Sequence, residues 1–167
     1  MARQKAETDG HGFPQPDHDH RHCIDQALGA AEALCAARGV RLTDQRRAVL
    51  RLLLEDHAPR GAYEIMDRLD WGERRPAPAQ VYRALEFLQE QGLVHRLASI
   101  NAFVSCWTPD RPHGAQFLIC RDCGTVAEMA DETVERAIVH AAGDAGFKVT
   151  APTVEIAGIC PNCAAGS

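Results

Sequence analysis

Residues 78–97 read PAQVYRALEFLQEQGLVHRL, and this stretch decides the fold. Its first part predicts a helix over about 79–91, because four apolar residues recur at helical spacing: Val81, Ala84, Leu85 and Leu88. Pro78 suits a first helical turn, where its missing N–H group would be unpaired in any case, and Gly92 ends the helix. The outward faces of this helix then carry Gln80, Tyr82, Arg83 and Glu86.

A β-hairpin is expected after this helix. Two strand-like runs, 93–98 and 102–107, are joined by the turn Ser99-Ile100-Asn101. Upstream, apolar residues at helical spacing predict helices over about 24–38 and 44–56, and Gly61-Ala62 opens a short helix through Leu69. Thr43 can cap the second of them, and Cys35 falls on the apolar stripe of the first, where a core role is expected. Helices followed by a hairpin are the plan of a winged helix-turn-helix.

A second, smaller domain is expected after the loop 108–114. Two strands, 116–120 and 125–129, precede a helix over about 132–145 and a last strand over about 147–158. The predicted fold class is α+β, with an N-terminal winged helix-turn-helix and a small C-terminal α+β domain. The bounds are 1–22 for a disordered, His-containing tail, 23–107 for the winged helix, 108–114 for a hinge and 115–167 for the second domain.

Four of the seven cysteines form two Cys-x-x-Cys turns in the second domain. Cys120 and Cys123 make the first pair, and Cys160 and Cys163 make the second. Two residues between ligands let one tight turn direct both thiolates at one ion, and two such turns complete the tetrahedral coordination of Zn²⁺. Gly124 suits the unusual backbone of the first turn. We predict a closed, structural zinc site, with two redox pairs or inert thiols as the alternatives.

The composition excludes several classes of protein. The chain has 167 residues and a formal net charge of −5, and 46% of its residues are hydrophobic, as in an ordinary globular protein. No apolar run approaches the ~18 residues of a membrane span and no signal sequence opens the chain, so a cytoplasmic location without membrane contact is expected. The charge is uneven, because residues 23–98 hold eleven Arg and eleven acidic residues while residues 99–167 carry −4. The acidic total therefore does not exclude nucleic acid as a partner of the first half.

These motifs together resemble the ferric-uptake-regulator (Fur) family of bacterial metal-dependent repressors. Residues 42–46 (LTDQR) resemble the opening of the family's second helix, and the two Cys pairs resemble its structural zinc site. Residues 80–85 (QVYRAL) with 91–94 (QGLV) resemble its recognition helix and the turn that follows. The resemblance spans about 23–163 and implies that the first domain binds DNA, that the second forms a homodimer, and that the protein is not an enzyme.

The sensing site separates the branches of this family. The zinc-uptake-regulator (Zur) branch uses two His, one Cys and one Glu, and the matching positions here are His95, Cys106, His113 and Glu128. In a hairpin that turns at 99–101, residues 95 and 106 lie near each other, and nitrogen, sulfur and carboxylate ligands suit Zn²⁺. Taken singly, each of these residues is more often an ordinary surface or core residue than a metal ligand. The iron- and peroxide-sensing branches carry a His-rich linker, whereas this linker has one His, which favours zinc.

The resemblance therefore implies a zinc-responsive transcriptional repressor. It would bind palindromic, double-stranded DNA operators of zinc-uptake genes as a zinc-loaded homodimer, with about two Zn²⁺ per chain and no small organic ligand. The DNA contacts that it implies are Tyr82 and Arg83 on the recognition helix, with Arg41 reaching the minor groove. Four further arginines are either phosphate contacts or solvated charges: Arg46, Arg47, Arg74 and Arg75.

Other functions remain as alternatives. An iron- or peroxide-sensing repressor of the same family would respond to Fe²⁺, and a zinc-dependent enzyme would need an open metal position with a general base such as Glu128. A zinc-ribbon adaptor without DNA binding would leave the Arg-rich winged helix unexplained. The tail could bind a further metal ion weakly, or it could be a flexible polar segment that binds none. The residues concerned are His18, His20, His22 and Cys23.

Overall fold

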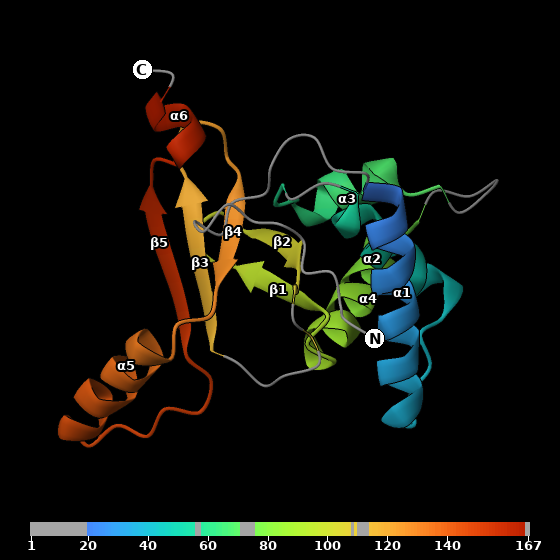
Figure 1. The fold of residues 1–167 in the computed structure, drawn as a ribbon. Coiled ribbons are helices and arrows are strands. Elements are labelled where there is room, and N and C mark those ends of the chain that lie inside the picture. The colour runs from blue at the N-terminus through green and yellow to red at the C-terminus, as the bar shows by residue number, and fades with distance from the viewer. Residues whose placement is uncertain (1–19, 56–57, 71–75, 108, 110–113, 166–167) are drawn as a thin grey trace. The chain divides into compact units, whose positions relative to one another are not determined.

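The computed structural model describes residues 20–55, 58–70, 76–107, 109 and 114–165, and the chain divides into two compact units between Arg111 and Pro112 (Figure 1). The first unit contains α1 (His20–Ala37), α2 (Asp44–Leu54), α3 (Ala62–Arg68), α4 (Pro78–Glu90), β1 (Val94–Leu97) and β2 (Ala102–Ser105). The second unit contains β3 (Ala115–Cys120), β4 (Val126–Met129), α5 (Glu132–Asp144), β5 (Thr153–Gly158) and α6 (Pro161–Ala165).

The core of the first unit is built from the apolar faces of its helices. Leu28 and Cys35 of α1 pack in one cluster with Leu53 of α2 and Leu88 of α4, and each of these side chains is at most 2% exposed. Helix α2 contacts α1, α3, α4 and β2 (Figure 1). The apolar stripes predicted for α1, α2 and α4 are therefore confirmed, and so is the core role of Cys35.

Short-range signals set the ends of these helices. Thr43 caps α2, because its side-chain oxygen accepts a hydrogen bond from the N–H of Arg46 at 3.5 Å. At the start of α4, the side chain of Gln80 accepts a hydrogen bond from the N–H of Ala77 at 3.0 Å. Gly92 follows α4 with a φ of +66°, a left-handed conformation that glycine adopts without a steric cost. The predicted cap and the predicted stop are both confirmed.

Strands β1 and β2 form the predicted hairpin, the wing. They pair antiparallel, with Val94 opposite Ser105 and Leu97 opposite Ala102. A third short segment joins them, because Arg60 and Phe103 exchange two backbone hydrogen bonds, of 3.0 and 2.8 Å. The sequence did not indicate this bridge, because a single residue pair is too short to show the alternation of apolar and polar residues that marks a strand.

The second unit is a three-stranded sheet in the order β4-β3-β5. Strands β3 and β4 pair antiparallel, whereas β3 and β5 pair parallel, so the chain crosses over through α5 between them. Parallel strands end at the same edge of a sheet, and in Figure 1 both arrowheads point toward α6. Asp131 caps α5 by accepting hydrogen bonds from the N–H groups of Thr133 and Val134, at 2.7 and 3.2 Å.

Two element boundaries and one short helix differ from the sequence predictions. Helix α1 begins at His20, so the prediction of a disordered tail is wrong for residues 20–22. The apolar period starts only at Ile24, but a helix can begin with a turn that contributes nothing to the apolar stripe. Strand β5 begins at Thr153 instead of residue 147, and α6 was not predicted, because one helical turn is too short to show a period.

The second unit leaves apolar side chains uncovered. None of the residues of α5 is buried, and the predicted apolar side of this helix is at best half-buried. Four large hydrophobic residues of this unit are exposed: Val139, Phe147, Ile156 and Ile159. An exposed apolar surface of this kind on a single chain marks a site where another molecular surface binds.

Candidate metal centre and nucleic-acid interface

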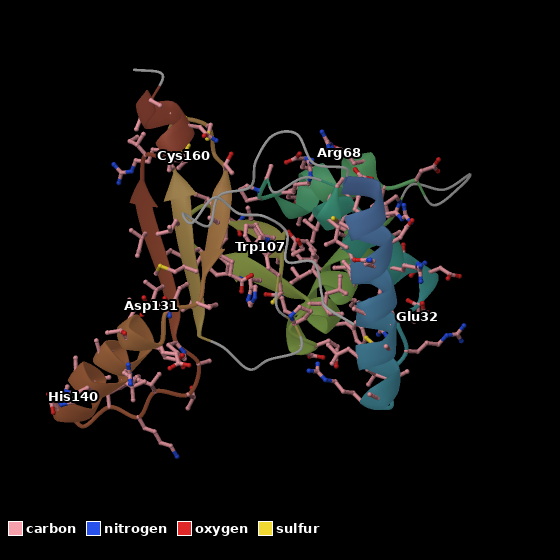
Figure 2. The ribbon with its side chains drawn as sticks, viewed as in Figure 1. Glu32, Arg68, Trp107, Asp131, His140 and Cys160 are labelled. Carbon is pink, nitrogen blue, oxygen red and sulfur yellow. The ribbon has the colours of Figure 1, made fainter. Side chains whose placement is uncertain are left out.

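Four cysteines converge at one edge of the sheet in the second unit. Cys120 ends β3 and Cys160 follows β5, so the parallel pairing brings the two Cys pairs together next to α6 (Figure 2). One ligand atom from each of the four residues lies within 4.8 Å of the others. The Sγ atoms of Cys123 and Cys160 are 3.7 Å apart. Four sulfurs at ~2.3 Å from one ion in a tetrahedron would be about 3.8 Å apart, so this spacing fits Zn²⁺.

The backbone around these cysteines supports negatively charged sulfur. Gly124 adopts a φ of +74° and closes the first turn by donating a hydrogen bond to the carbonyl of Cys120 at 3.0 Å. The N–H of Cys160 donates to Sγ of Cys120 at 3.3 Å, and the N–H of Cys163 donates to Sγ of Cys160 at 3.4 Å. Such N–H donors stabilise a thiolate more than a thiol.

The surroundings shift the pKa values of Cys120, Cys123 and Cys163 in different directions. The N–H groups of Cys123 and Cys160 lower the pKa of Cys120 to about 6, and the hydroxyl of Thr125 lowers the pKa of Cys123. Hydrogen bonds with Cys160 and Cys123 raise the pKa of Cys163 to about 12. Four thiolates this close repel one another, so a cation is needed to hold all four in the charged form that binds metal.

In the first unit, the wing brings together two of the predicted zinc-sensing residues. His95 lies on β1 and is half-buried, and Cys106 follows β2 and is buried. A ring nitrogen of His95 lies within 4.8 Å of Sγ of Cys106. The N–H of Cys106 donates to the carbonyl of Leu93 at 2.9 Å, which continues the hairpin pairing as far as this cysteine. The predicted closeness of residues 95 and 106 is confirmed.

The other two predicted zinc-sensing residues lie elsewhere in the chain. Glu128 is a half-buried residue of β4 in the second unit, opposite Phe117 in the strand register. His113 lies outside the described residues, and the same is true of His18, Arg74 and Arg75 and of the side chains of His20 and His22. The set of four ligands therefore stays a prediction.

The outward face of α4 carries the predicted DNA contacts. Tyr82 is 44% exposed, and Arg83 is exposed, with its Nε donating to the carbonyl of Ala79 at 3.1 Å. Tyr82 also lines a cavity of about 370 Å³ with Tyr63 of α3, Arg96 of β1 and other residues of this unit. The sequence analysis did not single out Tyr63, which is 68% exposed. The feature that could have identified it is an aromatic residue in the first turn of α3, a short helix whose apolar residues do not place Tyr63 in the core.

The arginines of α2 differ in their partners. Arg47 pairs with Glu32 of α1 at 2.8 Å, and Arg51 pairs with Asp25 of α1 at 3.0 Å. Arg46 instead stacks its guanidinium over the ring of Phe87, 3.5 Å from the ring centroid. Arg41, which precedes α2, is exposed. Acidic residues of α1 thus partly neutralise α2, and Arg41 and Arg46 are outside these two ion pairs.

The fold and the four-cysteine site define the class, a winged helix-turn-helix protein with a metal-binding α+β unit, so the predicted fold class is confirmed. Among the helices of the described residues, none combines the length and the apolar character needed to cross a membrane. The family model of the ferric uptake regulator family matches residues 37–157. The chain belongs to this family of regulators.

Similar proteins come from its zinc branch. The zinc uptake regulation protein of Escherichia coli is 41% identical over 139 residues, which cover 83% of this chain and 81% of the relative. The protein of the same name from Mycobacterium tuberculosis is 35% identical over 130 residues, covering 77% and 98% of the two chains. A solved structure of a zinc uptake regulator complexed with zinc and DNA has a TM-score of 0.81 and 40% identity, and the match covers 86% of this chain and 96% of that one.

Proposed function

We propose that this protein is a zinc-responsive transcriptional repressor that binds palindromic operators of zinc-uptake genes as a zinc-loaded homodimer in the cytoplasm. The observation that carries the proposal is the match, over most of both chains, with a zinc uptake regulator in complex with zinc and DNA. Peroxide- and iron-responsive relatives are less similar, at 33% and 27% identity. The zinc branch is therefore favoured over its iron- and peroxide-sensing siblings.

A structural zinc ion belongs to the four-cysteine site. Cys120, Cys123, Cys160 and Cys163 supply four soft sulfur ligands at tetrahedral spacing, and such a site has no open position for a substrate. When bound, the ion would neutralise the thiolates and fasten β3 to the chain that follows β5. Its role would be stability, because zinc that binds only the folded form adds its binding free energy to folding.

A regulatory zinc ion would be held by His95, Cys106, His113 and Glu128. This donor set of two nitrogens, one sulfur and one carboxylate oxygen suits four-coordinate Zn²⁺, and with the structural ion it makes about two Zn²⁺ per chain. The supporting observation is the wing, which directs His95 and Cys106 toward one point. Since Glu128 belongs to the second unit, an ion bound by all four residues would couple the wing to that unit.

Such coupling would make DNA binding depend on zinc. A metal ion shifts an equilibrium only by its differential affinity for the two states. If the ligands come together only in the arrangement that suits the operator, then zinc binding and operator binding strengthen each other by the same factor. The His95–Cys106 pair would already be close together in the zinc-free protein. Binding of the same ion by His113 and Glu128 would then favour the arrangement that binds DNA.

The homodimer would form through the second unit. This unit exposes Val139 and Phe147 around α5 and Ile156 and Ile159 around β5, and homodimer interfaces are more apolar than the rest of a protein surface. A two-fold axis would then present two copies of α4 to successive major grooves, about 34–36 Å apart or a multiple of that spacing. This geometry predicts a palindromic operator.

In each half-site, α4 would lie in the major groove. Tyr82 and Arg83 are both exposed on this helix, and we assign to Arg83 a contact with a purine and to Tyr82 a contact with a base or a thymine methyl group, as the family resemblance implies. Arg41 would enter the minor groove beside it. Arg46, in the first turn of α2, is a further candidate residue of this DNA-binding surface.

The test is operator affinity as a function of free zinc. Zinc-loaded protein selects duplexes from a random-sequence pool, and the affinity for a selected duplex is then measured with zinc buffered at different levels. We expect affinity to rise with free zinc, and metal content to be about two zinc per chain, falling by one in Cys106→Ser. Equal affinity with and without zinc at the sensor would contradict the proposal.

The operator assay, together with a hydrolysis assay, separates the alternatives. A stronger response to Fe²⁺ than to Zn²⁺, or release of DNA by peroxide through oxidised histidine, would identify a sibling repressor. Hydrolysis of a test ester or peptide that requires Glu128 would instead indicate an enzyme. Zinc-independent behaviour without any DNA selected from the pool would indicate an adaptor.

A further inference from the structure

Arg46 lies in an unusual place for a solvated cation. It is the third residue of α2, in the first turn after the Thr43 cap, where the partial positive charge of the helix end disfavours a positive side chain, although Asp44 in the same turn offsets part of that charge. The residue is only half exposed. A side chain that remains at such a site is held by contacts that outweigh this repulsion.

Two contacts hold the guanidinium of Arg46. Its central carbon, Cζ, lies over the ring of Phe87 at 3.5 Å from the centroid, the geometry of a cation–π pair. One of its terminal nitrogens donates a hydrogen bond of 2.6 Å to the backbone carbonyl of Arg41. A planar guanidinium can stack on an aromatic ring and donate a hydrogen bond from its edge at the same time. The compact ammonium group of lysine has no such plane.

These contacts join two elements of the proposed DNA surface. Phe87 is a buried residue of α4, one helical turn after Arg83, so the stack holds α2 to the recognition helix beside its predicted base contact. The hydrogen bond holds the backbone of Arg41, whose side chain is predicted to reach the minor groove. Arg38 anchors the other end of α4 in a similar way, by donating to the carbonyl of Gln91 at 2.6 Å.

We propose that Arg46 is a positioning residue, which keeps the Arg41 backbone and α4 in the relative arrangement that DNA binding requires, and that it does not contact a phosphate. The inference rests on the proposed function. Arg46 acts before DNA arrives, by raising the fraction of protein in which Arg41 and Arg83 are ready for the same half-site. When a binding-competent state is only fractionally populated, the apparent affinity falls by that fraction.

A phosphate contact and a positioning role predict different results for two variants. Arg46→Lys keeps the charge but loses the stacked fork, and Arg46→Gln loses both. If Arg46 contacts a phosphate, lysine largely restores affinity, and glutamine lowers the salt slope of log affinity by ~1 unit. If Arg46 positions its neighbours, both variants lose affinity by about 5- to 20-fold and the salt slope stays that of the unaltered protein.

The experiment measures affinity for the selected operator at several salt concentrations, in the full-length, zinc-loaded protein. Arg51→Gln is the matched control, since it removes the same charge from the same helix while its partner Asp25 lies on α1; its affinity should stay within about twofold. Phe87→Leu removes the ring but keeps an apolar side chain, and should reproduce part of the Arg46→Gln loss. It also serves as the second variant if Arg46→Gln does not fold.

A double-mutant cycle with Arg41→Ala completes the test. If Arg46 acts through Arg41, the Arg46→Gln loss shrinks in the Arg41→Ala background, because the positioned side chain is already gone. Full additivity, rescue by lysine, a lowered salt slope or an unchanged affinity in Arg46→Gln would each overturn the inference. Absence of zinc-dependent operator binding in the unaltered protein would overturn the proposed function instead, so the two failures are distinguishable.

Discussion

Cys35 of the first unit and Cys120 of the second unit have opposite surroundings. Cys35 is fully buried in the hydrophobic cluster of the helices, and burial raises the pKa of its thiol, although Arg38 and Arg46 oppose this shift. Cys120 is equally buried but receives backbone N–H groups, which lower its pKa to about 6. Burial alone therefore does not distinguish a core cysteine from a candidate metal ligand. Nearby N–H donors and other sulfur atoms do distinguish them.

The two units also differ in how much apolar surface they bury. The first unit has a continuous cluster of buried apolar residues drawn from its helices and the wing. The second unit has few buried apolar residues, none of them on α5, and four large hydrophobic residues exposed. A unit with so small a core needs a metal ion, a partner surface or both in order to be stable. We therefore expect the two units to respond differently to the same perturbation.

Loss of the structural metal should show the largest difference. In Cys160→Ser, we expect the second unit to unfold while the first keeps its helices, because structural zinc supplies about 10–16 kcal/mol of apparent binding free energy in small zinc domains. Amide hydrogen exchange read peptide by peptide measures this, with protection lost in β3 and β5 and kept in α1, α2 and α4.

The control for this prediction is Cys23→Ser, because Cys23 is exposed and outside both cysteine pairs. It should leave the exchange pattern unchanged. If Cys160→Ser left β3 and β5 fully protected, the second unit would not depend on the metal, and the contrast drawn between the two units would be wrong.

A core truncation should have the next largest effect, and on the other unit. Leu88 of α4 is fully buried, so Leu88→Ala should lower the free energy of unfolding of the first unit by about 2–5 kcal/mol. Urea denaturation followed by hydrogen exchange measures it, and zinc content at the four-cysteine site should not change. Ile100→Ala, at an exposed residue of the wing turn, is the control. Equal destabilisation of both units would mean that they fold as one.

A smaller effect is expected for Arg83, the proposed base contact of the first unit. Arg83→Ala should weaken operator binding by about 1–3 kcal/mol and reduce its preference over random DNA, without changing metal content. Competition binding with operator and random duplexes measures both quantities. Arg136→Ala removes the same charge from an exposed site of the second unit and should change neither. An unchanged ratio of operator to random affinity in Arg83→Ala would remove Arg83 from the specificity contacts.

The first unit was more predictable from the sequence than the second. Its helices bury one face within the same chain, so the apolar periods over Val81–Leu88 and the Thr43 cap correspond directly to structure. In the second unit, the part of the chain that the structure describes buries no residue of α5, so the apolar period predicted the helix but not its exposure. The single-turn helix α6 left no period at all.

The candidate sites show the same limit. Spacing predicted the four-cysteine cluster and the closeness of His95 and Cys106, because a tight turn and a hairpin fix those distances locally. The stacking of Arg46 on Phe87 could not be predicted, since it depends on how two helices pack. An arginine in a helical first turn looks the same in sequence whether it contacts solvent, a phosphate or an aromatic ring.

The smallest expected effect is a pH dependence that separates the two kinds of cysteine. The folded-state pKa of Cys35 lies above its ordinary value of 9.0, since burial disfavours the thiolate. Its contribution to stability is therefore fully present below pH 9 and decreases as the pH rises toward the folded-state pKa, because only the unfolded chain ionises this thiol readily. Urea unfolding of the first unit at successive pH values, compared with Cys35→Ala, isolates this contribution from the titration of other groups. The difference between the two proteins should be constant up to about pH 9 and shrink above it. A difference that stays constant to higher pH would mean that Cys35 ionises as easily in the folded protein as in the unfolded chain, and that its surroundings are closer to those of the metal-binding cysteines than its burial indicates.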